Sequence, residues 1–219
     1  MLSTYMHYDN VLYLKENDRI PASNEDLGIL LGKSQRTVTR ELVKLISCGL
    51  VKDTEVEHRG KKYPAFEMSK EFFYRGSHKW NGKARTAKTF ISTMRQLYQE
   101  NGASTLAFVA KLIPFVDKHS NIICKNPDRD VKYHECITLR VCDIAIIVGI
   151  NEKRAANLLR TTKFDGYHAF SRTRIGNSVL FKMNPDLVTR QEGMTAEAVR
   201  AEFTSKENTE DVTCNSITV

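Results

Sequence analysis

The sequence contains two short amphipathic segments within residues 24–50. The first repeats leucine at spacings of three and four, with Asn24 placed to cap it, and stops at Gly32, a residue that can adopt the left-handed conformation that ends helices. The second follows Ser34, which is expected to cap it. The pattern therefore predicts a helix-turn-helix. Its apolar positions are Leu27, Leu30, Leu31, Val38, Leu42 and Leu45.

The opposite face of the second predicted helix is polar and cationic. Such side chains reach phosphates and base edges when a helix of this kind lies in the major groove of DNA. An ordinary helical hairpin with a solvated basic face is the alternative interpretation. The residues expected to contact DNA from this helix and its cap are Ser34, Gln35, Arg36, Thr37, Thr39, Arg40 and Lys44.

Two stretches of alternating apolar and polar residues come next, at 55–57 and 65–68, and they predict a pair of strands. The residues between them, 58–62, combine a glycine with several cations. Two helices followed by a hairpin with a basic tip describe a winged helix, in which we expect a short strand at 10–14 to pair with the hairpin. The tip residues expected against the DNA backbone or minor groove are Arg59, Lys61 and Lys62.

The second half of the chain repeats the first. When Gly32 is aligned with Gly149, the core positions of both predicted helices fall on apolar residues. Residues 9–12 resemble 120–123 upstream, and 66–69 resemble 181–184 downstream after a two-residue shift. Three matching blocks in one order indicate a tandem duplication. The second set of expected DNA contacts is Asn151, Lys153, Arg154, Asn157, Arg160, Arg172 and Arg174.

These patterns predict an α+β fold, mostly helical with small β-wings, in which a helical linker joins two tandem winged helix-turn-helix domains. An amphipathic helix is expected at 84–101. It would pack on its own domain or on a second copy of the chain, and the second arrangement would make the protein a homodimer. The expected parts are an N-terminal winged-helix domain at 1–76, a linker and helix at 77–104, a C-terminal winged-helix domain at 105–190 and an acidic, disordered tail at 191–219.

Charge and composition narrow the expected partners. The chain of 219 residues is 41% apolar, which is enough to form cores, and carries a net charge of +7. Residues 191–219 hold two basic and six acidic side chains, so residues 1–190 hold 31 and 20, a net charge of +11. A folded part this basic favours a polyanion such as double-stranded DNA, although a merely soluble basic protein is the alternative. The longest apolar run, 144–150, is too short to span a bilayer, so we expect no membrane partner.

Sequence motifs of catalysis and metal binding are missing. There is no Gly-rich phosphate loop, no pair of histidines flanking a hydrophobic residue, and no nucleophile beside a base. The five cysteines have no metal-site spacing and fit free thiols in a reducing bacterial cytoplasm, where the protein is expected. We therefore predict a protein that is not an enzyme and needs no cofactor or metal.

The part from Phe90 onward resembles the RepL-type replication proteins of plasmids and phages, which are winged-helix proteins. The resemblance covers roughly 90–190, with a weaker echo over 10–76, and the tandem arrangement departs from the single-domain pattern of that family. It implies sequence-specific binding of double-stranded DNA by a replication initiator or a transcription regulator of a plasmid, phage or other mobile element. The alternative is a protein–protein interaction module whose winged helices do not contact DNA. The resemblance is carried by 112–114, 120–124, 144–149 and 183–187.

Overall fold

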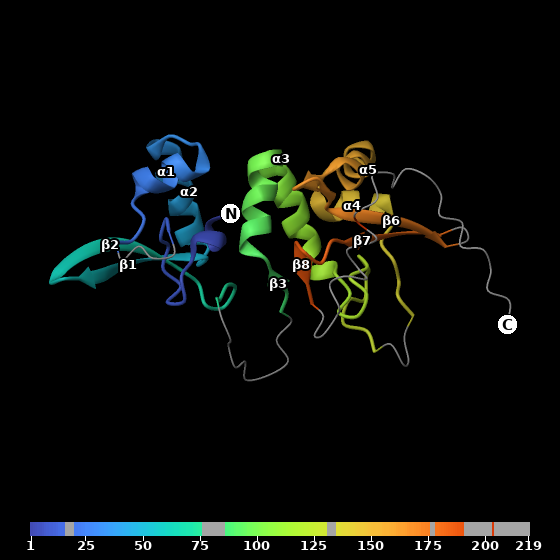
Figure 1. Cartoon of the computed structure of the whole chain (residues 1–219), viewed down its shortest axis with the longest axis horizontal. Helices are drawn as coiled ribbons and strands as arrows, with labels where there is room; N and C mark the ends of the chain where they lie inside the picture. The colour runs from blue at the N-terminus through green and yellow to red at the C-terminus, as the bar shows by residue number, and fades with distance from the viewer. Residues whose placement is uncertain (16–19, 76–85, 131–134, 176–177, 191–202, 204–219) are drawn as a thin grey trace. The chain divides into compact units, whose positions relative to one another are not determined.

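The computed structural model describes residues 1–15, 20–75, 86–130, 135–175, 178–190 and 203. In this part the protein is α+β, with five α-helices and small antiparallel strand pairs (Figure 1). The chain divides into two compact units, Met1–Ala84 and Arg85–Val219. None of the described helices is long and apolar enough to cross a bilayer.

The first unit has two adjoining helices and one hairpin, as the sequence predicts. Ser23, and not Asn24, caps the first helix, because its hydroxyl accepts from Asp26 N (3.2 Å) while the Asp26 carboxylate accepts from Ser23 N (2.9 Å). Gly32 ends this helix with a φ of 62°, which confirms the predicted left-handed turn. The elements are η1 (Leu2–Tyr5), α1 (Asn24–Leu31), α2 (Gln35–Ser47), β1 (Val51–His58) and β2 (Lys61–Met68).

The β1–β2 pair, named here the first hairpin, is longer than the sequence predicts. Its register runs from Val51 opposite Met68 to His58 opposite Lys61, so only two residues form the turn. Lys61 and Lys62 are therefore strand residues and not part of the turn, which corrects the prediction. The turn residues Arg59 and Gly60 have φ values of 52° and 72°, as hairpin turns that match strand twist require. Figure 1 shows the hairpin tip projecting beyond α1 and α2.

The expected strand at 10–14 does pair with the first hairpin, but only through isolated bridges. Val11 lies opposite Glu67, and Leu12 N donates to Phe66 O at 3.0 Å. This segment closes the core of the first unit, in which Leu12 is completely buried. The core cluster comprises Met6, Leu12, Ala22, Leu27, Val38, Leu42, Val51 and Met68.

The second unit begins with a strand and a long helix where the sequence predicts the linker helix. The helix starts at Ile91 and not at residue 84, because Lys88 and Thr89 are held extended against Thr189 and Val188. Gly102 breaks it with a φ of 79°. The elements are β3 (Lys88–Thr89), α3 (Ile91–Leu112), η2 (Ile113–Phe115), α4 (Val141–Val148), α5 (Glu152–Thr161), β4 (Lys163–Phe164), β5 (Tyr167–His168), β6 (Phe170–Ile175), β7 (Ser178–Met183) and β8 (Val188–Thr189).

The helix α3 belongs to the second unit and packs against α4 and β4. Asn101 Nδ2 donates to Lys163 O at 2.7 Å and fixes the helix beside the short β4–β5 turn. Met94 and Leu97 lie on the apolar face of the amphipathic helix that the sequence predicts, and they are 7% and 0% exposed. Both side chains are therefore buried within the second unit and are not available to a second copy. A dimer contact through 84–101 would lack the two central residues of the helix's apolar face.

The internal duplication appears in the geometry of the helix pairs. Asn24 and Val141 each begin the first helix of a pair, 117 residues apart, and each first helix ends at a glycine with positive φ. Gln35 and Glu152, again 117 residues apart, begin α2 and α5. Asn151 is the cap of α5 and not its first residue, since its side chain accepts from Arg154 N at 2.8 Å.

A pair of buried asparagines repeats as well. Asn10 and Asn121 have φ values of 67° and 55° and are 3% and 1% exposed. Each donates its amide to two carbonyls on the far side of its unit, so each joins the start of the unit to the segment that follows the hairpin. The acceptors are Met68 O (3.2 Å) and Phe73 O (2.8 Å) for Asn10, and Met183 O (3.3 Å) and Val188 O (2.9 Å) for Asn121.

The expected acidic tail at 191–219 lies outside the described residues, with the exception of Phe203. The Phe203 side chain is 2% exposed. The tip of the β6–β7 pair, residues 176–177, also lies outside the described part of the chain.

Candidate nucleic-acid interface

The helix α2 exposes one continuous polar surface. Val38 and Leu42 are 2% and 4% exposed and face the core, because they are spaced one helical turn apart. Leu45 and Ile46 are partly buried and pack beside them, and the side chains on the opposite face are exposed. Five of the seven residues predicted to contact DNA from this region are exposed and belong to α2 itself: Gln35, Arg36, Thr39, Arg40 and Lys44.

Three hydroxyl residues of the predicted set already have roles in the helix. Ser34 accepts from Thr37 N at 3.3 Å, and the two side-chain hydroxyls lie 2.9 Å apart. Thr39 donates to Gln35 O at 3.0 Å and accepts from the Asn24 side chain at 3.3 Å. The structure therefore gives these hydroxyls capping and bracing functions, and leaves the amide of Gln35 and the cations as the outward groups.

An acidic residue that sequence reasoning missed lies between two of these cations. Glu41 Oε1 is 3.6 Å from Arg40 Nε and 3.3 Å from Lys44 Nζ. The Arg40 and Lys44 side chains are 68% and 62% exposed, and ion pairs this exposed contribute little free energy. Both cations can consequently leave Glu41 for a phosphate or a base. The sequence does carry a signal for these two ion pairs, because Arg40 and Lys44 lie one and three residues from Glu41.

The first hairpin has the expected basic tip, but an acidic row lies along one of its strands, a feature that is not predicted from the sequence. Asp53, Glu55 and Glu57 are exposed and alternate along β1, so they share one face of the hairpin. Lys62 lies on this face as well and pairs with Glu55 at 3.5 Å. Residues 51–68 contain four basic and four acidic side chains. Positive charge is therefore concentrated at the tip, on Arg59 and Lys61.

The helix α5 presents the corresponding surface in the second unit. Ala155 and Leu159 are buried at 0% and 3%, and the remaining positions are mostly exposed. Arg160 Nη2 donates to Asn157 Oδ1 at 3.3 Å, which turns the amide nitrogen of Asn157 outward. The exposed residues that the sequence predicts as DNA contacts here are Lys153, Arg154, Asn157 and Arg160, with the cap residue Asn151.

In the β6–β7 pair, named here the second hairpin, all charged side chains are cationic. Arg172 and Arg174 are exposed and lie two residues apart, so they point to the same face. Residues 170–183 contain these two arginines and Lys182 and no acidic residue. The two hairpins, each of which follows a helix pair, therefore differ in charge by three.

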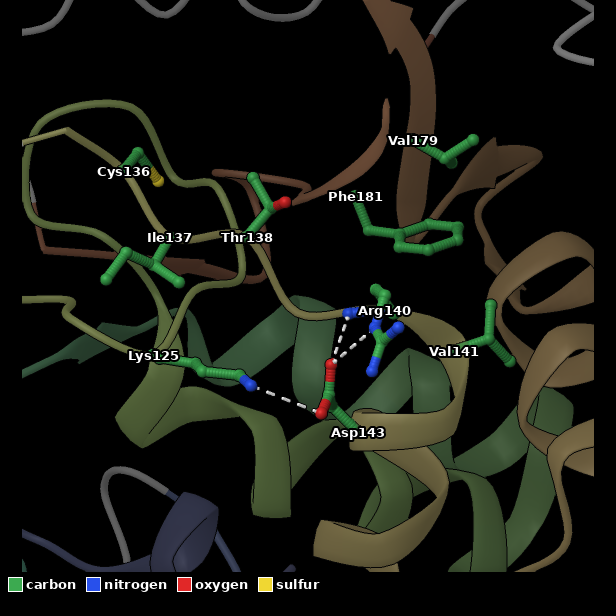
Figure 2. A pocket seen from close by; sticks show the side chains of 9 residues that line it. All are labelled: Lys125, Cys136, Ile137, Thr138, Arg140, Val141, Asp143, Val179 and Phe181. Atoms are coloured by element: carbon green, nitrogen blue, oxygen red, sulfur yellow. Dashed lines mark hydrogen bonds and ion pairs between the residues drawn. The ribbon is translucent and has the colours of Figure 1, made fainter. Parts of the chain in front are cut away.

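A cleft of about 640 Å³ opens beside the start of α4 (Figure 2). Asp143 occupies its charged side, where its carboxylate accepts from Arg140 N at 3.0 Å and lies 3.3 Å from Lys125 Nζ. The hydrogen bond from the Arg140 backbone is the main reason that the pKa of Asp143 lies below its usual value. Asp26 holds the corresponding position in α1 and also has a lowered pKa, caused first by the Ser23 hydroxyl. Both carboxylates therefore serve to cap helices.

The thiol that lines this cleft is a poor nucleophile. Cys136 lies beside Cys124, and burial raises the pKa of both thiols, that of Cys124 to about 12. A thiol reacts as its thiolate, and at neutral pH both cysteines remain protonated. Chemically, the cleft offers a structural carboxylate and two cations bound to it.

Exposed cations thus lie on α2, α5 and the two hairpins, the elements that the sequence predicts. Other described cations are exposed as well, among them Lys33, Lys70, Lys88, Lys111, Lys125, Arg140 and Lys163. No family model, no curated protein and no solved structure matches the chain. What the protein binds is therefore inferred from the chemistry of these surfaces.

Proposed function

We propose that the protein binds double-stranded DNA sequence-specifically through two winged-helix units, as a transcription regulator or replication initiator of a plasmid, phage or other mobile element. The observation that supports this most strongly is the repeated amphipathic second helix. In both units that helix buries its apolar face and exposes arginine and amide side chains in its first two turns. These are the side chains that read base edges in the major groove.

The two helices differ in the bases that they are suited to read. Arg36 and Arg40 of α2 correspond to Lys153 and Asn157 of α5, 117 residues later. Arginine favours guanine, since it donates to both O6 and N7, whereas asparagine favours adenine. We therefore expect two contacted segments with different sequences, of which the segment at α5 is richer in A·T.

The hairpins contribute phosphate contacts in unequal measure. Residues 170–183 of the second hairpin contain Arg172, Arg174 and Lys182 and no acidic residue, so we expect this hairpin to lie along the DNA backbone. The first hairpin can approach phosphates only at its tip, because the exposed carboxylates along β1 are repelled by them. Non-specific affinity is therefore expected to come mainly from the second unit.

The row formed by Asp53, Glu55 and Glu57 favours one alternative, in which the first unit binds a basic protein and not DNA. Neutralising the row distinguishes the two functions. If DNA lies near the first hairpin, Glu57→Gln should strengthen DNA binding modestly for all sequences, because it removes a like charge from the vicinity of phosphates. A protein partner bound to this row should instead be weakened by the same change.

Substitutions on α2 and on the hairpin tip are expected to separate specificity from general affinity. Arg36→Ala and Arg40→Ala should each cost about 1–3 kcal/mol on the specific site and little on random DNA, because these side chains face bases. Lys61→Ala should weaken binding to all sequences about equally. Lys62→Ala should have a smaller effect, because Glu55 and Glu57 share its face of the hairpin and their negative charges offset its attraction to phosphates. Titration of each variant against specific and random duplexes measures both quantities.

Glu55→Gln is the matched control for the hairpin, because it releases Lys62 while leaving its position unchanged. In that background Lys62→Ala should cost more than it does in the wild type, because only Glu57 then offsets its charge. The assignment of the surfaces would be reversed if the hairpin variants altered sequence preference and the α2 variants did not.

A further inference from the structure

The segments that follow the two hairpins have the same conformation. Residues 69–75 correspond to 184–190 one by one, and each turn is closed by the same backbone hydrogen bond. Each segment ends in an arginine whose guanidinium donates to a backbone carbonyl that precedes the helix pair of its unit. The shared bonds are Phe73 N to Ser69 O (2.9 Å) and Val188 N to Asn184 O (3.2 Å), and Arg75 Nη1 to Met6 O (3.3 Å) and Arg190 Nη1 to Val116 O (3.1 Å).

In the second unit this segment is covered by a strand. The strand β3 pairs antiparallel with β8, and Phe90 N donates to Leu187 O at 3.2 Å as the chain enters α3. Leu187 and Val188 are consequently 0% exposed. The covering element is thus an extended strand that runs antiparallel and ends in an aromatic residue.

The corresponding segment of the first unit is aromatic, and two of its three aromatic side chains are exposed, while Phe73 packs against the core. Phe72, at the position of the buried Leu187, is 57% exposed, and Tyr74 is 38% exposed. Tyr8 is 63% exposed, and the guanidinium of Arg75 lies over its ring at 4.9 Å. Tyrosine, phenylalanine and arginine are the residues that are enriched where protein surfaces meet. We name residues 71–75 together with Tyr8 the aromatic edge.

We propose that the aromatic edge binds the aromatic edge of a second copy of this chain, so that the protein dimerises through its first units. An antiparallel pair of identical segments is two-fold symmetric, so a second copy supplies the same kind of cover that β3 gives to β8. Charge favours this arrangement as well. Glu71 and Arg75 flank the aromatic residues, and antiparallel pairing brings the Glu71 end of each copy toward the Arg75 end of the other.

This dimer differs from the one that the sequence suggests, because it uses residues 71–75 and leaves α3 inside its own unit. It does not depend on DNA binding. If the protein does bind DNA, the dimer would place two copies of α2 about a two-fold axis, and the bound site would contain an inverted repeat.

Sedimentation equilibrium of the full chain without DNA tests the proposal. The wild type should be dimeric at about 100 µM, and Phe72→Glu and Tyr74→Glu should each weaken self-association by about tenfold or more, since buried aromatic residues dominate interface energies. Ile29→Glu is the matched control, because Ile29 is 78% exposed on α1 of the same unit and outside the aromatic edge. It should leave the dimer unchanged.

Hydrogen exchange provides a second readout on the unmodified protein. The amide protons of Tyr74 and Arg75 should exchange more slowly at high protein concentration than after dilution, because pairing protects them, whereas that of Phe73 already donates to Ser69 O. A wild type that stays monomeric at about 100 µM overturns the proposal. So does a dimer that persists in both aromatic-edge variants, or one that Ile29→Glu disrupts equally. Loss of DNA binding in a variant that still dimerises would count against the proposed function alone.

Discussion

Raising the salt concentration from about 50 to about 200 mM is expected to weaken DNA binding by roughly 10³–10⁵-fold, because two docked units should neutralise roughly six to ten phosphates. Each neutralised phosphate releases condensed counterions, and added salt opposes that release. The slope of log K against log salt should be about −0.9 per phosphate. Fluorescence anisotropy with a labelled duplex, repeated at several salt concentrations, measures it.

The arginines of the second hairpin should each contribute to the slope of log K against log salt. Arg172→Ala and Arg174→Ala should each make it shallower by about one unit, since each removes one cation that is expected to contact a phosphate. Lys70→Ala is the control, because Lys70 lies outside the reading helices and hairpins and is paired with Glu67 at 3.1 Å. Affinity that hardly changes over the salt range would rule out a phosphate-dominated interface.

The largest effect on stability is expected from Asn121→Ala, a loss of about 3–7 kcal/mol in the free energy of unfolding. The change removes donors from Met183 O and Val188 O inside the second unit, and leaving buried carbonyls unpaired costs about 1–3 kcal/mol each. It also places an alanine at a φ of 55°, which adds about 1 kcal/mol. Urea unfolding of the full chain, followed by circular dichroism, measures the change.

Asn121→Gly separates the two causes. It loses the same hydrogen bonds but adopts positive φ readily, so it should be more stable than Asn121→Ala by about 1 kcal/mol. Asn10→Ala should produce a similar loss in the first unit, where the acceptors are Met68 O and Phe73 O. If all three variants lost less than about 1 kcal/mol, these hydrogen bonds would not join the ends of the units as described.

The helix pairs and the duplication could be predicted from the sequence because their signals are local. Gly32 and Gly149 stand at the ends of leucine- and isoleucine-rich turns, and a left-handed glycine there is specified by its neighbours. The buried faces of α2 and α5 follow from helical spacing alone. The exposure of the predicted cations on both helices follows from the same periodicity.

Other features depend on contacts between distant residues. The start of α3 is set by pairing of Lys88 and Thr89 with residues 100 positions later, which no local pattern reveals. The row of Asp53, Glu55 and Glu57 appears only when β1 is known to extend from Val51 to His58. The cap of α1 differs from the prediction for a local reason. Ser23 and Asn24 are both suitable N-cap residues, and Ser23 takes the capping position.

The most direct test of two DNA-reading units is a footprint of the full chain on duplexes selected from a random pool, compared with footprints of Arg40→Ala and Asn157→Ala. The account predicts an enriched sequence with two kinds of contacted segment, each about one major-groove face wide. Arg40→Ala should lose protection over one kind and Asn157→Ala over the other, the A·T-rich one. A pool with no enriched sequence would contradict sequence-specific binding, and loss of protection over the same base pairs in both variants would contradict two separate reading units.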